Sequence, residues 1–278
     1  MKMVIGRDDL ATAAQQAAPT LERVDVKPVH KASWGFVNDA SVDVCELAIV
    51  TLLQAAAYDK PVLLLPVTAL IRAQHQTLVT RTDGLTLDDL EGRSVGVRSW
   101  SQTTGVWMRG FLTEQYGIDL RKAEWTVYEG SHVAEYQDPE WVGRAPEGRK
   151  LPTDFLDGRL DFGIMGNELP DAPGIRTVIP DAAKVAAEWS RATGFIPINH
   201  VVGVTESAAR EHPAAVLAAY DAMCEVTNLA GFEALRGPVS RAAAYALEQQ
   251  VLPRAVEYDE LVDRTCAALG VAPTRLGG

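Results

Sequence analysis

A turn rich in hydrogen-bonding side chains precedes a predicted helix near the middle of the chain. The polar residues of this turn are Ser99, Ser101, Gln102, Thr103 and Thr104. A helix N-terminus leaves backbone N–H groups unpaired and carries a partial positive charge, so such a turn favours an anionic ligand, for example a carboxylate. One polar residue is enough to cap a helix, so an ordinary cap on a core helix is the alternative interpretation.

Three further residues could complete an anion or ring site. Arg109 lies one to two turns into the helix, where its guanidinium could pair with a carboxylate in a forked geometry. The alternative for Arg109 is a structural salt bridge. Trp100 could stack on an aromatic ligand, although a tryptophan in such a pattern is more often part of the core. Asn167 follows the apolar strand 160–165, and residues beyond the carboxyl end of a strand tend to reach a cleft.

Histidines supply the candidate proton-transfer groups, because histidine ordinarily titrates near neutral pH. His200 follows an apolar run and is the first candidate for acid/base work; a buried structural histidine is the alternative. His75 follows an apolar strand and could act as an acid/base group or bind a phenol. His132 lies between carboxylates, at spacings that fit no tight metal motif, and could face a cleft or solvent. His30 ends a predicted strand and could contact a ligand.

Glu46 interrupts a strongly apolar segment, residues 42–57, for which the pattern predicts one helix. A lone carboxylate there either occupies the exposed first turn, where the helix dipole favours it, or points into a cleft. Both interpretations stay open from the sequence, and the second makes Glu46 a candidate catalytic residue.

The elements that must position these residues alternate between strands and helices before giving way to helices only. The expected strands are 3–5, 24–30, 61–67, 76–80, 95–97, 124–128, 160–165 and 195–204. The expected helices are 8–17, 42–57, 86–91, 103–117, 151–158, 206–211, 213–230, 238–250 and 257–269. The alternation predicts an α/β fold with a parallel or mixed sheet between helices. Residues 137–154, rich in Pro, Gly and charge, are expected to form an exposed loop, with a mobile flap as one interpretation.

Composition excludes several partner classes. The chain has 278 residues, 47% of them hydrophobic, and a formal net charge of −11, which argues against nucleic-acid and anionic-membrane partners. The N-terminus lacks a signal-peptide pattern, no apolar run approaches 18 residues, and three dispersed cysteines form no CxxC pair. We therefore expect a reduced, cytoplasmic protein without a membrane segment.

Several segments, taken in order, resemble one known family. They are residues 43–55, 64–79, 102–120, 155–164, 194–202 and 211–213, and the most specific is TTGVWMRG within 102–120. Together they resemble the 4,5-dihydroxyphthalate decarboxylase family, which shares the type II periplasmic-binding-protein fold. The resemblance implies two α/β lobes joined by two crossover strands, with a ligand cleft between them. Lobe one would comprise residues 1–95 plus 205–278, and lobe two residues 96–204.

The resemblance also implies an activity: decarboxylation of a hydroxylated aromatic acid by ring protonation and loss of CO2, without an organic cofactor. The expected catalytic residues are His200, His75 and Glu46. The expected substrate-binding residues are Ser99, Trp100, Gln102, Thr103, Thr104, Arg109, Arg72, His132 and Asn167. A non-catalytic solute-binding protein for a small carboxylate of an ABC-type uptake system is the alternative. No metal site is expected, although assistance by a divalent ion stays open, as does a homo-oligomer.

Overall fold

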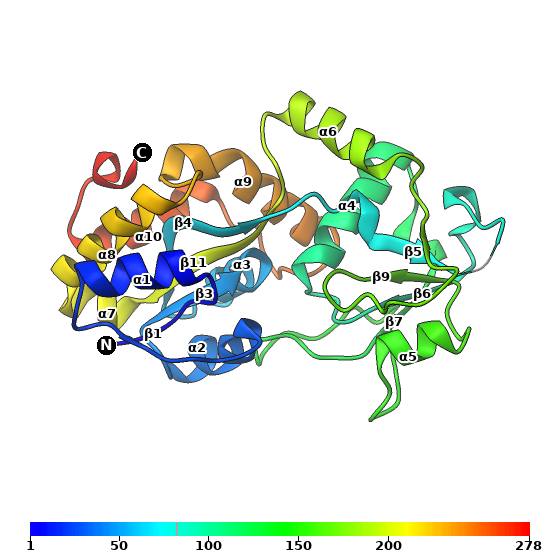
Figure 1. Ribbon diagram of the computed structural model, residues 1–278, viewed down its shortest axis with the longest axis horizontal. Coiled ribbons are helices and arrows are strands. Elements are labelled where there is room, and N and C mark those ends of the chain that lie inside the picture. Colours follow the sequence, from blue (N-terminus) through cyan, green and yellow to red (C-terminus); the bar gives the residue numbers. More distant parts are fainter. Residues whose placement is uncertain (82) are drawn as a thin grey trace.

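Two lobes, each built on its own β-sheet, lie side by side along the long axis of the molecule (Figure 1). The computed structural model describes residues 1–81 and 83–278. The first sheet has the order β2 (Glu22–Arg23), β1 (Lys2–Val4), β3 (Val44–Ala48), β11 (Ile198–Thr205), β4 (Val62–Ile71). The second has the order β10 (Arg176–Thr177), β5 (Leu78–Thr80), β9 (Phe162–Ile164), β6 (Ser94–Val97), β7 (Glu124–Val127), β8 (Gly143–Arg144). Both sheets mix parallel and antiparallel pairs, as the α/β prediction allows.

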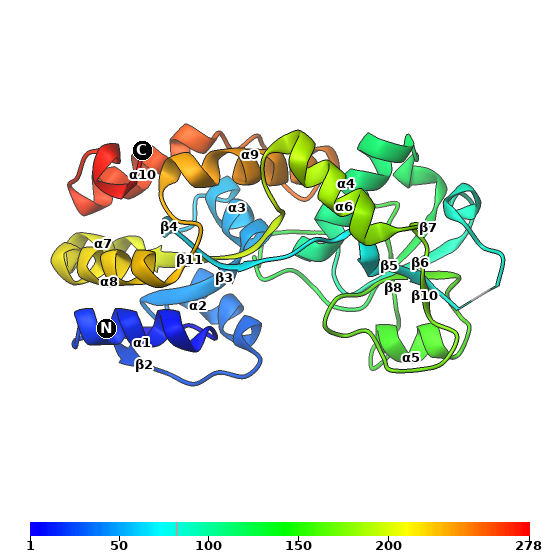
Figure 2. The same ribbon diagram turned by 45° about the horizontal axis from the view of Figure 1, so that its top comes forward.

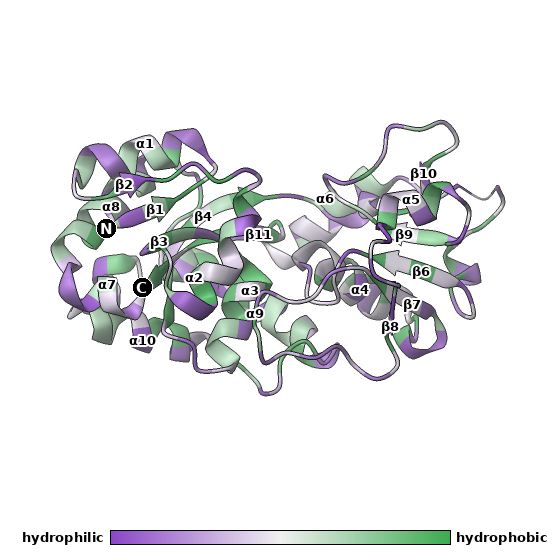
Figure 3. Ribbon diagram, turned by 90° about the horizontal axis from the view of Figure 1, so that it is seen from below, coloured by the Kyte–Doolittle hydropathy of each residue, from purple (hydrophilic) through white to green (hydrophobic). Residues whose placement is uncertain are grey.

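Helices surround both sheets. The first lobe carries α1 (Asp8–Ala17), α2 (Ser33–Asp39), α3 (Ile49–Ala57), α7 (Glu206–Glu211), α8 (Pro213–Val226), α9 (Phe232–Glu248) and α10 (Tyr258–Leu269). The second carries α4 (Thr103–Tyr116), α5 (Leu151–Leu156) and α6 (Ala182–Thr193). Figure 2 shows α9 running from the first lobe toward α4 of the second. In Figure 3, α3 is largely hydrophobic while α1 alternates between hydrophobic and hydrophilic turns, consistent with full burial of α3 and one buried stripe on α1.

Two adjacent antiparallel strands carry the chain between the lobes. The chain leaves the first lobe at the end of β4 and returns along β11, with Ile71 paired to Ile198. The expected two-crossover topology is therefore present, but the expected boundaries are wrong. β5 and β6 belong to the second sheet, so the chain enters the second lobe near residue 72 and not near residue 95. β11 belongs to the first sheet, so the chain re-enters the first lobe near residue 197 and not near residue 204.

The predicted helix over 42–57 is wrong in its first half. Residues 44–48 form strand β3, and α3 begins only at Ile49. A continuous apolar run is compatible with a buried helix or a buried strand, and periodicity alone does not separate them. Here β3 lies between β1 and β11, and both ladders use its backbone, so tertiary pairing decides the strand.

Two smaller differences concern loops. The expected strand over 24–30 is wrong: β2 ends at Arg23, before this segment, and a short 3-10 turn forms at Val29–Ala32. The segment 137–154 is not a loop throughout, because it contains β8 and the start of α5. Among the described residues no helix is long and apolar enough to span a membrane.

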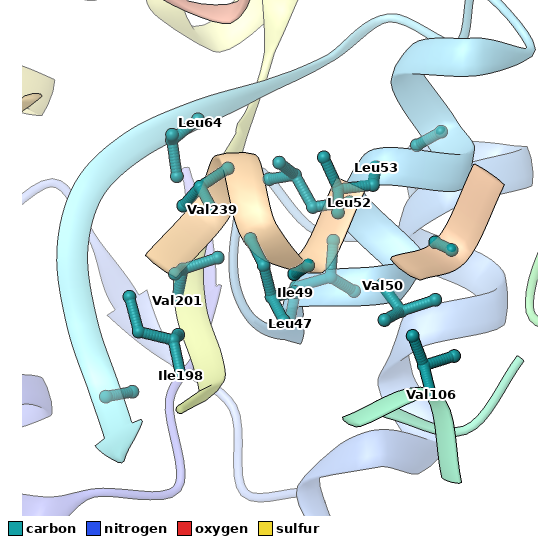
Figure 4. Packing of buried hydrophobic residues seen from close by; sticks show 14 of the residues in the cluster. Leu47, Ile49, Val50, Leu52, Leu53, Leu64, Val106, Ile198, Val201 and Val239 are labelled. Atoms are coloured by element: carbon teal, nitrogen blue, oxygen red, sulfur yellow. The ribbon is translucent and has the colours of Figure 1, made fainter. Parts of the chain in front are cut away.

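One continuous hydrophobic core connects the lobes. It contains Leu47, Val50 and Val201 from the first lobe and Val106 from α4. Figure 4 shows Val106 beside Val50, with the α9 residue Val239 over the same cluster. Because α4 packs against α3 and α9, the N-terminus of α4 is held at the junction of the lobes. This junction is where the cleft opens.

Candidate active site

A cavity of about 390 Å³ lies between the lobes, a size that suits a small aromatic acid. The first lobe and the crossover strands contribute Pro28, His30, Ala48, Thr51, Leu70, Arg72, Asn199 and His200. The second lobe contributes Arg98, Ser99, Ser101, Gln102, Thr103, Thr104, Glu129, Gly130, His132, Asn167 and Glu168. Most of the sequence-predicted site residues are thus brought together, although they come from segments far apart in the chain.

Strand register places His200 beside Glu46. In the antiparallel pair of β3 and β11, His200 lies opposite Ala48 and Val202 lies opposite Glu46, so the side chains of His200 and Glu46 are diagonal neighbours on one face. His200 Nδ1 is 2.6 Å from Glu46 Oε1. Glu46 therefore contacts the cavity-lining His200, from a strand and not from a helix.

The backbone at the start of α1 holds the other oxygen of Glu46. The N–H groups of Gly6 and Arg7 donate to Oε2 at 2.8 and 3.3 Å. Burial raises the pKa of Glu46, but the hydrogen bond and charge of His200 and these two donors outweigh it, so the pKa lies below its ordinary value. The ionised carboxylate therefore accepts the Nδ1–H of His200 and leaves Nε2 as the nitrogen for a ligand.

Two more histidines line the cavity as neutral groups. His132 Nδ1 lies 3.2 Å from Thr51 Oγ1, and the His132 ring stacks at 6.5 Å on His30. Burial, with the nearby Arg98, lowers the pKa of His132 to about 4, and the same two causes lower the pKa of His30. Near neutral pH both rings can exchange hydrogen bonds with a hydroxyl without carrying charge.

Arg72 supplies positive charge at the N-terminus of α4. Its Nη1 donates to Asn167 Oδ1 at 2.7 Å, and its Nη2 donates to Thr104 Oγ1 at 3.2 Å. Gln102, at the N-cap, makes no capping bond and donates instead to Glu168 Oε1 at 2.8 Å. This favours the anion-site interpretation of the polar turn over the ordinary cap.

The remaining polar residues of that turn also reach the cavity. Ser99, Ser101 and Thr103 line it, and Ser99 Oγ donates to the carbonyl of Gly130 at 3.1 Å. The Thr103 hydroxyl accepts from the backbone N–H of Val50 at 3.3 Å, which ties the start of α4 to α3. The turn is therefore fixed by both lobes before any ligand is present.

Arg109 and Trp100 are wrong as ligand-binding residues. Trp100 is fully buried between Trp125 and Trp141, and the Arg109 guanidinium stacks 3.6 Å from the centre of the Trp100 ring. Arg109 Nε donates to Gln249 Oε1 at 2.8 Å. Five residues beyond Thr104, Arg109 faces a different side of α4, away from the cavity.

His75 is wrong as a catalytic candidate. It is 1% exposed, its ring stacks 4.1 Å from that of Phe111, and Nε2 lies 3.0 Å from Gln115 Nε2, an amide that donates to it. Burial lowers the pKa of His75, so the ring is neutral. The chain has already crossed into the second lobe at this point, and His75 packs beneath α4 and α6 instead of facing the cleft.

Sequence reasoning missed Arg98, Glu129, Thr51 and Asn199. Arg98 directly follows β6, and Glu129 lies two residues after β7. The same reasoning that identified Asn167, that residues beyond the carboxyl end of a strand tend to reach a cleft, would have found both. Thr51 was hidden inside the predicted long helix. Within residues 1–81 and 83–278 no group of three or more His, Cys, Asp or Glu side chains is arranged to hold a metal ion.

The chain is similar in sequence to two curated 4,5-dihydroxyphthalate decarboxylases, which confirms the resemblance seen in its motifs. It is 32% identical to the protein from Comamonas testosteroni over 189 residues, which cover 63% of this chain and 57% of that protein. It is 28% identical to the protein from Pseudomonas putida over 171 residues, 56% of this chain and 66% of that protein. The matches thus span less than two thirds of either relative. No protein-family model matches the chain.

Solved structures with the same architecture confirm the two-lobed fold. A ligand-binding component of an ABC-type import system from Staphylococcus aureus aligns with a TM-score of 0.55 at 12% identity, over 99% of this chain and 97% of that chain. The periplasmic aliphatic sulphonate binding protein SsuA from Escherichia coli aligns with a TM-score of 0.51 at 11% identity, over 99% of this chain and 80% of that chain. At these identities the likeness shows the fold alone.

Proposed function

We propose that the cleft decarboxylates a hydroxylated aromatic carboxylic acid, a carboxy-lyase reaction without an organic cofactor. The names of the two curated relatives support this reaction class. The observation that carries the proposal is the His200–Glu46 pair at 2.6 Å, with Nε2 of His200 left for the ligand in the cavity that Arg72 also lines. A receptor needs charge and hydrogen bonds for its ligand, whereas a carboxylate-oriented imidazole is typical of a proton-transfer site.

The proposed reaction requires one proton on carbon. Arg72 and the start of α4 hold the substrate carboxylate, and His132 with His30 binds a hydroxyl ortho or para to it. His132 or His30 takes the hydroxyl proton as the oxygen's electron pair enters the ring, and the ring carbon bearing the carboxylate takes a proton from Nε2 of His200 in its doubly protonated form. The C–C bond then breaks, its electrons restore the aromatic ring, the oxygen recovers its proton from the same histidine, and CO2 leaves.

Overall, the reaction consumes one acid anion and one proton and produces one arene and one CO2. Glu46 does not touch the substrate; it fixes the His200 ring so that Nε2 faces the reacting carbon. A positioned general acid contributes on the order of 10²–10⁴-fold, and orientation in a closed site adds to this.

The test is CO2 release from ortho- and para-hydroxylated benzoates and phthalates, with meta-hydroxylated and unsubstituted acids as negative controls. Release confined to the ortho and para compounds supports the proposal, because only these hydroxyls feed electrons to the carboxylated carbon. A parallel series with EDTA tests for a required divalent ion.

A solute-binding protein remains the competing function, since the solved structures with this fold are binding proteins. Saturable binding of one of these acids without CO2 release from any of them would establish that alternative. An inactive His200→Asn variant beside an active His212→Asn variant would support catalysis, because His212 is exposed between α7 and α8.

A further inference from the structure

The charged side chains that line the cavity are two arginines and two glutamates, and they are not equivalent. Arg98 Nη1 lies 3.1 Å from Glu129 Oε2, so this arginine already has a carboxylate partner. Arg72 donates only to the neutral oxygens of Asn167 and Thr104, and among the described residues no carboxylate lies within ion-pair distance of it. Glu168 hydrogen-bonds Gln102 and acts on Arg72 electrostatically from a longer distance, without forming an ion pair with it.

The backbone keeps the Arg98–Glu129 pair in register. β6 and β7 are parallel neighbours with Val97 opposite Val127, and Arg98 and Glu129 lie one and two residues beyond the two strand ends. The backbone N–H of Glu129 donates to the carbonyl of Arg98 at 2.7 Å, and that of Tyr128 donates to the same oxygen at 3.0 Å. The two side chains are therefore adjacent because the strand ends are adjacent, and a ligand does not have to assemble them.

Two histidines among the described residues, His30 and His132, also lie close to this pair. Both are neutral near pH 7 because burial and Arg98 itself lower their pKa values. A carboxylate placed there would face Glu129 as well as Arg98 and would gain little net attraction. A phenolic hydroxyl, which is neutral and both donates and accepts, suits the same place.

We propose that Glu129 is a specificity-determining residue, which compensates Arg98 and restricts the cavity to hydroxylated aromatic acids with a single carboxylate, bound at Arg72. This inference rests on the proposed decarboxylation for the choice of substrates, and deepens it. It predicts that a hydroxylated benzoate is preferred over the phthalate with the same hydroxyl pattern. It also predicts that removing the charge of Glu129 frees Arg98 to accept a second carboxylate.

The experiment compares the wild type with Glu129→Gln on such a matched pair of acids. We expect the ratio of kcat/KM for the phthalate to that for the benzoate to rise at least about tenfold in Glu129→Gln, equivalent to about 1.4 kcal/mol. Glu91→Gln is the matched control, because Glu91 forms a similar exposed ion pair with Lys122 outside the cavity, and its ratio should equal that of the wild type.

A wild type that prefers the phthalate, or an unchanged ratio in Glu129→Gln, would overturn the inference while CO2 release itself upheld the decarboxylase. If no acid releases CO2, the proposed function fails. The role of Glu129 is then tested by binding, as the ratio of the dissociation constants of the same two acids. A shift of that ratio toward the phthalate in Glu129→Gln would uphold Glu129 as the selectivity residue, and an unchanged ratio would reject it.

Discussion

His200 and Glu46 lie 154 positions apart in the sequence, yet Nδ1 of one is 2.6 Å from Oε1 of the other. Two adjacent strands hold the pair, and the N–H groups of Gly6 and Arg7 hold the far oxygen of Glu46. The pair thus depends on two strands of one sheet and on the loop that follows β1. The backbone N–H groups orient the Glu46 carboxylate, and the carboxylate orients the His200 ring, as a proton donor requires.

Replacing His200 with Asn should abolish turnover without unfolding the protein. The Asn amide can still donate to Glu46, but it cannot transfer a proton, so we expect kcat to fall by about 10²–10⁴-fold. Affinity for the acid, measured by calorimetry, should stay within a few fold of the wild type. Turnover equal to that of the wild type would remove His200 from the mechanism.

The pH dependence of stability should carry a contribution from His132. Its pKa is about 4 in the folded protein against an ordinary value of 6.5, so between these values the unfolded chain binds a proton that the folded protein excludes. The contribution is fully present above pH 6.5, declines as the pH falls, and is lost below about 4. We expect on the order of 1–3 kcal/mol across this window.

Urea unfolding at pH 7.5 and pH 5 measures this contribution. In His132→Asn the difference between the two free energies of unfolding should shrink, while in His212→Asn, where the histidine is exposed, it should match the wild type. A difference of wild-type size in His132→Asn would show that His132 is not the group responsible.

Arg109→Lys should lower stability and leave ligand affinity intact, although the sequence suggested that Arg109 binds the ligand carboxylate. The guanidinium donates to Gln249 and to the carbonyl of Trp100, and a lysine cannot make both bonds while stacking on the Trp100 ring. We expect a loss of about 2–4 kcal/mol in the free energy of unfolding. Calorimetric affinity below the melting transition provides the second readout.

The matched control for Arg109→Lys is Arg93→Lys, because Arg93 is half exposed and lies 3.8 Å from Asp161. Its effect on unfolding should stay within about 0.5 kcal/mol. A weakened ligand affinity in Arg109→Lys at unchanged stability would restore Arg109 to the binding site.

Gly110→Ala should strain the contact between α4 and α9. An added Cβ would lie 2.2 Å from Tyr245 Cδ2 and 2.4 Å from its Cε2, so the two helices would have to separate. Overpacking of this kind costs about 1–3 kcal/mol. Thermal unfolding measures the loss, with Gly130→Ala as control, since a Cβ there meets no atom within 4 Å. Equal melting temperatures for both variants would contradict the tight helix contact.

Local sequence pattern was sufficient for most elements and for part of the site. α1, the β6–α4 unit and the helices α7, α8 and α10 fall close to where periodicity and capping residues place them, because their signals lie within a few turns of chain. The polar turn before α4 and Asn167 after β9 reach the cavity for the same reason, since both follow strand ends. Arg98 and Glu129 also follow strand ends, so the same reasoning would have predicted that they reach the cavity.

Only the tertiary structure decided which candidates face the cleft. Strand pairing turned the first half of the apolar segment 42–57 into β3, and its register with β11 brought Glu46 to His200. The crossing near residue 72 carried His75 away from the cleft, and the packing of α4 enclosed Arg109. These outcomes depend on contacts between distant segments, and residue types and spacing along one segment do not encode the register and burial that such contacts impose.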